Sequence, residues 1–431
     1  AAGSPVVLKP APQTPRCAAV AVDAVRRALV DAGADPGVLQ VARVPEDEVG
    51  RHLVTPPAVA RVLLTGSIET ARLFSGWRPD LQVLAETSGK NAVVVTPSAD
   101  VDLAVADVVR SAFGHAGQKC SAASLLILVG TAGRSARLRR QLADAVTSLA
   151  VGRRWTPGVR HGVVPGSFFH TTECFGPVLG VIRVDTLDEA IAVQNATSFG
   201  LTGGLHSLDE AEIEHWLDRV EVGNAYVNRH ITGAIVQRQP FGGWKASVVG
   251  PGAKAGGPGY VAQLGEWHDA PGLEDPAQWL AAARADDLAV WPQMRRPADP
   301  TALAAEENAL RHRAVDHLWL RVGAGAAEHH VSRVRSAAAT VGVPVTTSTL
   351  SDEADEAFAR RVAAGEVTGR VRVIGSAPGL RAAAAGRVGD VTVLDGPVLA
   401  SARRELRTVT REQAISRTRH RFGHLDPTRS G

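Results

Sequence analysis

The residue types most capable of chemistry lie in the stretch 113–124, Phe-Gly-His-Ala-Gly-Gln-Lys-Cys-Ser-Ala-Ala-Ser. Cys120 follows a Gly117-Gln118 pair, and a glycine beside it lets backbone approach a ligand closely. A thiolate in such a place can attack a carbonyl carbon. The alternative is that Cys120 is a small buried hydrophobic residue, as many cysteines are, because reactivity depends on pKa and exposure.

A second stretch, 84–95, reads Leu-Ala-Glu-Thr-Ser-Gly-Lys-Asn-Ala-Val-Val-Val and places Glu86 just before a glycine turn and an apolar strand. A carboxylate at a strand end, beside a cysteine nucleophile, can act as the general base of a hydrolytic step. The two stretches together therefore favour covalent catalysis more strongly than either stretch alone.

The elements around these residues predict how they are positioned. Apolar residues recur at helical spacing over 101–116, so a helix precedes Cys120, and 125–129 is an apolar strand that follows it. Upstream, strands and helices alternate, which predicts a parallel sheet. The expected strands are 4–10, 38–44 and 61–65, and the expected helices are 15–32 and 68–74.

Gly66-Ser67 follows the 61–65 strand directly and opens the next helix. A helix N-terminus after a glycine turn is a place where a phosphate can bind. An ordinary turn is the other interpretation, since Gly and Ser are common turn residues.

Composition excludes several classes of protein. The chain has 431 residues, 45% hydrophobic and 21% charged residues and a formal net charge of +3, which is typical of a globular protein of two or three domains. Three cysteines give no paired framework and indicate a reducing compartment, so we expect a cytoplasmic protein. Abundant Ala, Arg and Val favour a bacterial source. No apolar run is long enough for a membrane span, and no metal site is expected.

The region after 275 is predicted to be a separate small α/β layer, with strands at 317–322, 343–348, 369–374 and 391–394 and helices at 328–341 and 380–386. His329-His330 is interpreted as a solvated pair, because two histidines alone are too few ligands for a metal. A basic cluster at 411–423 could contact nucleic acid or be a solvated tail.

The two reactive stretches resemble the glutamate-glycine-glycine-lysine and glycine-glutamine-x-cysteine signatures of the aldehyde dehydrogenase superfamily. The glycine-rich stretch 229–260 resembles, more narrowly, the pyrroline-5-carboxylate (glutamate-γ-semialdehyde) dehydrogenases, and especially the module of bifunctional proline utilization proteins. This resemblance implies an α/β fold with a partial Rossmann-type NAD-binding domain, an α/β catalytic domain and a further C-terminal α/β domain. It also implies that the chain lacks early strands of the family's cofactor domain, together with an oxyanion asparagine.

The resemblance assigns roles by position. Cys120 is the nucleophile and Glu86 the general base. Residues that would contact NAD are Lys9 at the adenosine ribose, Gly66 and Ser67 at the pyrophosphate, Glu173 at the nicotinamide ribose and Phe175 at the nicotinamide. Residues that would line the substrate site are Lys119, Ser121, Gly233, Ala234 and Phe241. Two positions depart from the family pattern: Pro12 replaces a frequent glutamate, which leaves NAD versus NADP open, and Gln237 replaces a usual glycine.

The implied domains are a partial NAD-binding domain at 1–85, a catalytic domain at 86–245 with an internal deletion near 152–153, a tail and linker at 246–275, and a C-terminal domain at 276–431.

The implied activity is NAD-dependent oxidation of L-glutamate-γ-semialdehyde to L-glutamate. The alternative is an inactive dehydrogenase fragment that serves as a binding or assembly module. Implied partners are the small-molecule substrate, an upstream proline dehydrogenase domain and further copies of the chain, with no nucleic acid. The C-terminal region would cover or support the dehydrogenase module.

Overall fold

The computed structural model describes residues 3–45, 48–150, 157–272, 274–421 and 424–425. Among these residues the largest sheet has eight strands in the order β14-β19-β11-β10-β5-β6-β8-β7. All neighbouring strands are parallel except β14 and β19, which are antiparallel. The strands are β5 (Asn91–Val95), β6 (Ala123–Val129), β7 (Gly158–His161), β8 (Val178–Val184), β10 (Thr202–His206), β11 (Asn224–Val227), β14 (Glu306–Ala314) and β19 (Thr410–Thr418).

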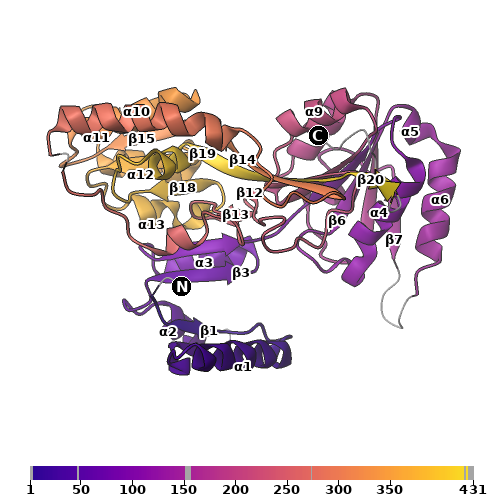
Figure 1. Cartoon of the computed structure of the whole chain (residues 1–431), viewed down its shortest axis with the longest axis horizontal. Helices are drawn as coiled ribbons and strands as arrows, with labels where there is room; N and C mark the ends of the chain where they lie inside the picture. The colour runs from indigo at the N-terminus through magenta and orange to yellow at the C-terminus, as the bar shows by residue number, and fades with distance from the viewer. Residues whose placement is uncertain (1–2, 46–47, 151–156, 273, 422–423, 426–431) are drawn as a thin grey trace.

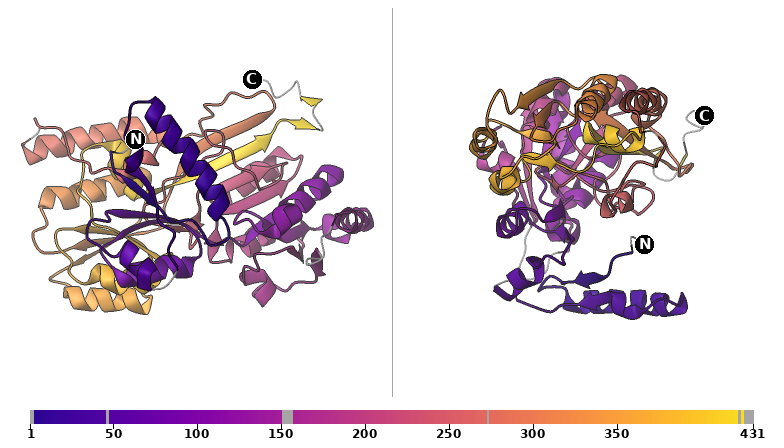
Figure 2. Two further views of the ribbon diagram at one scale, coloured as in Figure 1. Left: turned by 90° about the horizontal axis from the view of Figure 1, so that it is seen from below. Right: turned by 90° about the vertical axis from the view of Figure 1, so that its left-hand side faces the viewer.

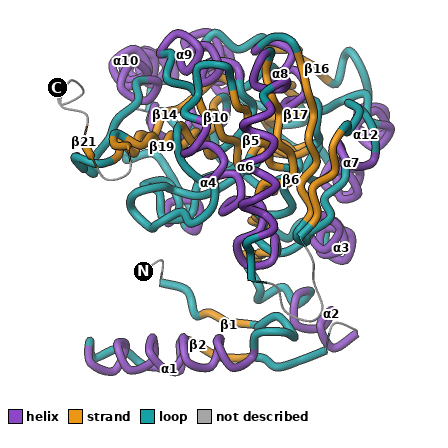
Figure 3. Tube along the Cα trace, turned by 90° about the vertical axis from the view of Figure 1, so that its right-hand side faces the viewer, coloured by secondary structure: helices purple, strands orange, loops and turns teal. Residues whose placement is uncertain are grey.

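Both faces of this sheet are buried, which is why β5 is apolar at consecutive positions. Ala92 and Val94 pack into a core with helices α8 (Leu187–Asn195) and α9 (Glu210–Arg219). Val93 and Val95 point to the opposite face, where they pack with α4 (Val101–Phe113) and α6 (Ala136–Thr147). Figure 3 shows α4 and α6 on the near side of β5 and β6. Short helices α5 (Thr131–Arg134) and α7 (Phe168–Thr171) complete this part.

A smaller sheet carries the strand that ends at Glu86. Its order is β13-β4-β3, with β3 (Arg61–Thr65) parallel and β13 (Val248–Val249) antiparallel to β4 (Gln82–Glu86). Helix α3 (Ile68–Trp77) covers it through a small apolar core. Beside it, β9 (Phe199–Gly200) and β12 (Trp244–Lys245) form a two-stranded antiparallel pair.

The N-terminal residues form a separate layer. Strands β1 (Val6–Leu8) and β2 (Leu39–Val41) pair in parallel beside helix α1 (Pro15–Asp31) and the 3-10 turn η1 (Pro36–Val38), and α2 (Glu48–Val54) leads on to β3. In Figures 1 and 2, α1 and β1 lie apart from the rest of the molecule. Exposed valines on this layer are Val6, Val7, Val20, Val25 and Val30.

The C-terminal region contains a four-stranded parallel sheet in the order β16-β15-β17-β18. Its strands are β15 (Leu318–Val322), β16 (Val345–Thr349), β17 (Gly369–Ile374) and β18 (Val391–Leu394). Its helices are α10 (Pro276–Arg295), α11 (Glu328–Val341), α12 (Asp355–Ala364), α13 (Leu380–Ala384) and α14 (Ala402–Glu405), with 3-10 turns η3 (Val261–Leu264), η4 (Ala385–Arg387) and η5 (Leu406–Thr408).

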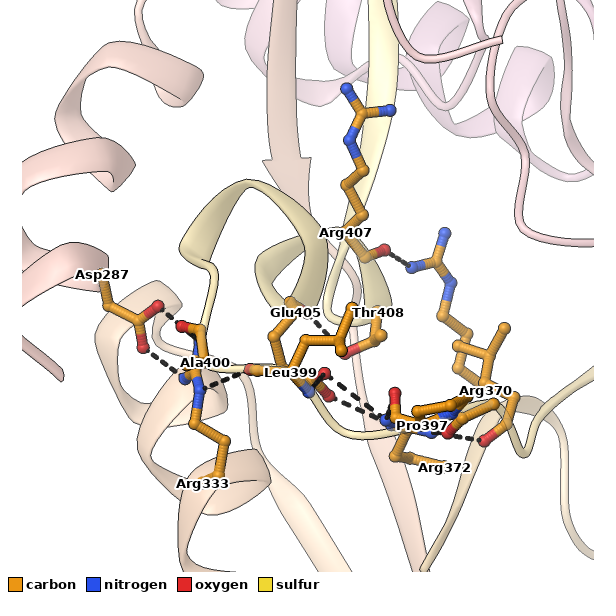
Figure 4. A network of polar contacts seen from close by, with 12 residues as sticks. Asp287, Arg333, Arg370, Arg372, Pro397, Leu399, Ala400, Glu405, Arg407 and Thr408 are labelled. Atoms are coloured by element: carbon orange, nitrogen blue, oxygen red, sulfur yellow. Dashed lines mark hydrogen bonds and ion pairs between the residues drawn. The ribbon is translucent and has the colours of Figure 1, made fainter. Parts of the chain in front are cut away.

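Two buried ion pairs hold this region together (Figure 4). Arg333 on α11 donates to both carboxylate oxygens of Asp287 on α10, at 2.6 and 2.9 Å, and to the carbonyls of Leu399 and Ala400. Arg372 on β17 pairs with Glu405 at 3.1 Å. Since buried charges are tolerated only when paired and hydrogen-bonded, these contacts fix the segment between β18 and α14.

The C-terminal region and the large sheet are joined by β14 and β19, which run between the two parts in Figure 1. Ala414 on β19 pairs with Asn224 on β11, so strands from the end of the chain extend the sheet that holds the candidate nucleophile. The short pair β20 (His420–Arg421) and β21 (His424–Leu425) follows. No helix among the described residues has the length and apolar character needed to cross a membrane.

Most predicted elements are confirmed within a few residues, and β3, α11, β17 and β18 have the predicted bounds. The helix predicted over 101–116 is too long, because His115 and Ala116 adopt left-handed backbone angles after α4 ends at Phe113. Residues 411–418 of the basic cluster form most of β19 and are not a solvated tail. The predicted deletion at 152–153 lies outside the described residues.

Candidate active site

Cys120 lies in a tight connection between α4 and β6. The 3-10 turn η2 (Gly114–Gly117) follows α4 and contains the left-handed residues His115, Ala116 and Gly117. A Cβ on Gly117 would lie 2.3 Å from the carbonyl oxygen of Gly176, so only glycine lets these two segments meet. Gly117, three residues before Cys120, is therefore required for the close backbone contact with Gly176.

Asn91 clamps this connection. Its side-chain nitrogen donates to the carbonyl of Cys120 at 2.7 Å and to that of Ala122 at 2.9 Å, and its oxygen accepts from the backbone N–H of Thr202 at 3.0 Å. Asn91 is 2% exposed, so these three contacts satisfy groups that water cannot reach. Its place at the start of an apolar strand did not predict this role.

Glu86 is the last residue of β4 and faces the same site. Its Oε2 accepts a hydrogen bond from the backbone N–H of Gly243 at 3.0 Å. A Cβ on Gly242 would lie 2.8 Å from its Oε1, so the Gly242-Gly243 pair is small enough to admit the carboxylate. The structure thereby brings the predicted base to a polar turn beside the predicted nucleophile.

The two side chains influence each other electrostatically. Burial raises the pKa of Glu86 to about 7, although the nearby Lys254 cation and the Gly243 N–H favour the ionised form. Burial also raises the pKa of the Cys120 thiol, and the Glu86 and Glu173 carboxylates raise it further. The thiol is therefore protonated near neutral pH and needs a base to become a nucleophile. A carboxylate with a pKa near 7 is suited to accept that proton.

The predicted nicotinamide residues also reach this site. Glu173 Oε1 accepts from the N–H of Gly89 at 3.1 Å, three residues beyond Glu86. Burial raises the pKa of Glu173 and lowers that of Lys90, whose cation is favoured by Cys174 and Glu173. Phe175 is 51% exposed with φ +42°, so its ring is accessible to a ligand.

The predicted pyrophosphate turn is well formed. Ser67 caps α3 by accepting from the N–H of Thr70 at 3.3 Å, and Gly66 donates to the carbonyl of Glu86 at 3.2 Å. Lys9, by contrast, follows β1 in the separate N-terminal layer, because β2 does not pair with β3 in this structure. The structure therefore groups Gly66 and Ser67 with Glu86 in one sheet but places Lys9 in another.

The predicted substrate residues lie on two segments. Lys119 and Ser121 flank Cys120, and Ser121 is buried with its carbonyl accepting from the Thr202 hydroxyl at 3.3 Å. Gly233 has φ +81°, a backbone angle that glycine adopts easily and other residues do not. The adjacent Ala234 is half-buried. No hydrogen bond in the described part of the chain joins Ser121 to this Gly-Ala pair.

Other contacts fix the rest of that loop. The N–H of Ile231 donates to the Ser111 hydroxyl on α4 at 3.0 Å. Phe241 exchanges two backbone hydrogen bonds with Ala255, at 2.9 and 2.8 Å. Gln237, where the resemblance leads us to expect glycine, has φ +67°, so the left-handed backbone is retained without the glycine.

Sequence reasoning missed Lys254 and Glu412. Lys254 is completely buried, and Glu412, which is 4% exposed, reaches it from β19. Lys254 lies in the glycine-rich stretch 229–260, where the glycines and not the lysine suggested a function. No local pattern marks Glu412, because its neighbour is 158 residues away.

A cavity of about 490 Å³ lies between the β3–β4 sheet, the segment 249–268 and the C-terminal region. Its walls include Leu84, Trp267, Arg404 and Glu412, but neither Cys120 nor Glu86. A cavity of this size is often the first candidate for an active site. Here Cys120 and Glu86 lie outside the cavity, so it is separate from the predicted catalytic residues.

Comparison with known proteins agrees with this geometry. The model of the aldehyde dehydrogenase family matches residues 1–165 and 154–267. The chain is 36% identical to the bifunctional protein PutA of Rhizobium meliloti, over 65% of this chain and 27% of that protein. It is 34% identical to the 1-pyrroline-5-carboxylate dehydrogenase of Bacillus pumilus, over 60% of this chain and 59% of that protein.

Solved structures give the same result. Proline utilization A from Corynebacterium freiburgense is similar over 98% of this chain and 48% of its own, with 43% identity and a TM-score of 0.86. A 1-pyrroline-5-carboxylate dehydrogenase from Thermus with bound NAD is similar over 61% of this chain and 59% of its own, with 32% identity and a TM-score of 0.54. The chain thus spans between about a quarter and three-fifths of the length of the curated relatives named above. Because the family model matches more than half of its residues, the chain belongs to the aldehyde dehydrogenase family.

Proposed function

We propose that this chain carries out the NAD-dependent oxidation of L-glutamate-γ-semialdehyde to L-glutamate in proline catabolism. The observation that carries the proposal is that Cys120 and Glu86 are both half-buried and close enough for the carboxylate to raise the pKa of the thiol. The substrate is suggested by the relatives, whose names include 1-pyrroline-5-carboxylate dehydrogenase. The sequence resemblance in the 229–260 segment supports the same choice.

The proposed chemistry begins when Glu86 accepts the thiol proton and the Cys120 sulfur bonds to the aldehyde carbon, giving a thiohemiacetal. As the oxyanion of this adduct re-forms the C=O bond, the carbon loses its hydride and a thioester remains on Cys120; NAD⁺, when bound, would supply the hydride acceptor. Glu86, once ionised again, takes a proton from water as the water oxygen attacks the thioester carbon. The carbon–sulfur bond then breaks, and glutamate leaves as the thiol is restored.

The residues present fit part of an NAD site. Ser67 caps the ten-residue helix α3, and no hydrogen bond joins the N–H groups of Ile68 and Glu69 to an acceptor among the described residues. Such free N–H groups at a helix start suit a pyrophosphate. Phe175 and Glu173 would hold the nicotinamide end, and Lys9 is the proposed ribose contact. The similar dehydrogenase from Thermus, solved with bound NAD, supports NAD as the cofactor.

The substrate site is proposed from the loop geometry. A carboxylate is best recognised by several N–H donors, and the small residues Gly233 and Ala234 leave their backbone N–H groups approachable. Ser121 and Lys119 would complete this end from the Cys120 segment, and Phe241 would pack on the aliphatic part. We also propose the domain boundaries at 85/86, 245/246 and 275/276 and the deletion near 152–153 as expectations for comparison with a complete dehydrogenase.

Assembly and location are further parts of the proposal. The relatives named bifunctional support an upstream proline dehydrogenase domain as a partner. Self-association and a cytoplasmic location follow from the family resemblance. The second candidate function is a catalytically inactive binding or assembly module, and it is favoured by one observation: Lys9 lies in a layer whose strands do not join the sheet of Gly66.

The test is a spectrophotometric assay of the purified chain with NAD⁺ and glutamate-γ-semialdehyde, with Cys120→Ala as the matched variant. We expect reduced cofactor to form, and the rate to fall by at least about 10³-fold in the variant because the nucleophile is lost. An aldehyde of the same length without the α-carboxylate should react more slowly. No turnover from a folded chain would favour the inactive module.

A further inference from the structure

The peptide group between Gly242 and Gly243 lies between a buried lysine and the candidate general base. Its N–H, on Gly243, donates to Glu86 Oε2 at 3.0 Å. Its C=O, on Gly242, accepts a hydrogen bond from Lys254 Nζ. The two hydrogen bonds therefore share one peptide unit, with the cation at its oxygen and the carboxylate at its N–H.

We propose that Lys254 is a positioning residue that acts on Glu86 through the Gly242–Gly243 peptide, keeping the base ionised and oriented. A cation at a peptide oxygen polarises the group and makes its N–H a stronger donor, and hydrogen bonds in such a chain reinforce each other. A stronger donor favours the charged form of the carboxylate that it contacts. This inference deepens the proposed function and rests on it for the role of Glu86.

The surroundings hold Lys254 in this position. Its backbone N–H donates to Glu412 Oε2 at 3.0 Å, and its Nζ lies 3.4 Å from Asn224 Oδ1. Asn224 Oδ1 also accepts from the N–H of Gly242 at 3.1 Å, so it fixes the same turn from β11. Lys254 is fully buried, and its ammonium therefore needs the acceptors that Asn224 Oδ1 and the Gly242 carbonyl supply.

The fit leaves no room for larger residues. A Cβ on Gly242 would meet Glu86 Oε1 at 2.8 Å, and one on Gly243 would meet the Ser247 side chain at 2.5 Å. Both glycines are therefore needed for the peptide to lie edge-on between the two charges. A glycine pair gives little hint of this role in the sequence, because it is also what an ordinary loop would contain.

The charge of Lys254 is in turn supported from the C-terminal strand. Glu412 on β19 pairs with Arg407 at 2.8 Å, and its pKa is held at about 2 by hydrogen bonds and nearby cations that outweigh its burial. Burial lowers the pKa of Lys254 to about 8, while Glu86 and Glu412 favour its charged form. Strand β19 thus supplies, through Glu412, a negative charge that stabilises the charged form of Lys254.

The charged and titratable groups around the pair come from every neighbouring element. Those that influence Glu86 or are influenced by it are Lys254, Cys120 and Tyr260. Those near Glu412 are His312, Arg407 and Arg370. Of these, Lys254 is the cation that acts on Glu86, so its removal is the decisive change.

The test titrates Glu86 directly by infrared difference spectroscopy, following the protonated-carboxyl band that disappears in Glu86→Gln. We expect a midpoint near the pKa of about 7 in the unmodified chain. In Lys254→Met the midpoint should rise by about one pH unit or more, since the cation no longer favours the carboxylate. Lys245→Met is the matched control, because Lys245 lies in β12, two residues after Gly243, but pairs with Glu221 at 2.6 Å. In this variant the midpoint of Glu86 should not move.

A second variant covers the case in which Lys254→Met does not fold. Lys254→Gln keeps a donor for the carbonyl of Gly242 while removing the charge, and it should also raise the midpoint. An unchanged midpoint in a folded charge-removing variant would overturn the proposal. Because the titration requires no turnover, its failure is distinguishable from failure of the proposed dehydrogenase activity.

Discussion

At the scale of single residues, the site depends on a thiol and a carboxylate that are both poorly ionised on their own. Burial raises the pKa of Cys120 and raises that of Glu86 to about 7. Because the pKa of Glu86 lies near neutral pH, its ionised form is available there to accept the proton of the Cys120 thiol. This balance is a property of the folded chain, since neither residue is unusual in its local sequence.

The pH dependence of thioester hydrolysis should reflect Glu86. The base is active when deprotonated, so the single-turnover hydrolysis rate should increase about tenfold per pH unit below its pKa and level off above about 7. Stopped-flow measurement of acyl-enzyme decay between pH 5.5 and 9 would test this. In Glu86→Gln the increase should be absent; a profile with the same shape in this variant would assign the base to another group.

Sequence reasoning singled out some of these residues and missed others, and the catalytic roles of Cys120 and Glu86 stay predictions. Cys120 and Glu86 were found from their types, from the glycines next to them and from the family resemblance, and the structure brings them together. Lys254 and Asn91 were missed, because a lysine among glycines and an asparagine before a strand have many ordinary explanations. Their importance comes from what they contact, and contacts over long separations are not visible in a local pattern.

At the scale of elements, the loop between α4 and β6 has its shape because Asn91 on β5 satisfies three backbone groups at once. Its position at the start of a central strand makes the loop rigid, as a nucleophile requires. The left-handed residues His115 and Ala116 lie earlier in this loop, before the residues that Asn91 contacts.

Asn91→Ala should therefore destabilise the chain by about 3 kcal/mol, because buried carbonyls lose their donor without access to water. Urea unfolding followed by circular dichroism would measure this. Asn195 offers a matched control: it makes a similar pair of backbone contacts, to Arg219 and Glu221, at a partly exposed place. Asn195→Ala should cost less than about 1 kcal/mol; equal losses for both variants would contradict the role of the clamp.

Elements with strong local patterns were predicted well. Helix α11 has an apolar face and ends at Gly342, and β18 is a short apolar strand bounded by turn residues. The strands β14 and β19 were not predicted. They are rich in charged residues, such as Arg311 and Arg411, whose side chains fold back onto partners at the sheet edge. Such strands lack the alternation that marks most strands.

At the scale of the whole molecule, β19 ties the C-terminal region to the candidate active site. It pairs with β11 and carries Glu412 to the buried Lys254. The opposite end of the chain is different, because the α1–β2 layer lies apart from the remaining sheets in Figure 2. Long-range pairing of this kind depends on tertiary contacts, so sequence patterns alone could not predict which parts would join.

Glu412 should make stability depend on acid pH. Its folded pKa of about 2 lies below its ordinary value of 4.5, so the unfolded chain binds a proton more readily. Its contribution is present above pH 4.5 and is lost as pH falls toward 2, amounting to about 3 kcal/mol. Urea unfolding at a series of pH values would measure the decline, which should be smaller in Glu412→Gln by that amount. A decline of equal size in both proteins would exclude this role.

The most direct test of the central claim is intact-protein mass spectrometry of Glu86→Gln after mixing with NAD⁺ and glutamate-γ-semialdehyde. Without Glu86 the thiol is activated more slowly, because no base accepts its proton, but the thioester is also not hydrolysed, so after prolonged incubation one glutamyl adduct should accumulate and map to Cys120. The adduct should be absent from Cys120→Ala and short-lived in the unmodified chain. An adduct on another residue, or one that also forms in Cys120→Ala, would contradict the assignment of Cys120 as the nucleophile.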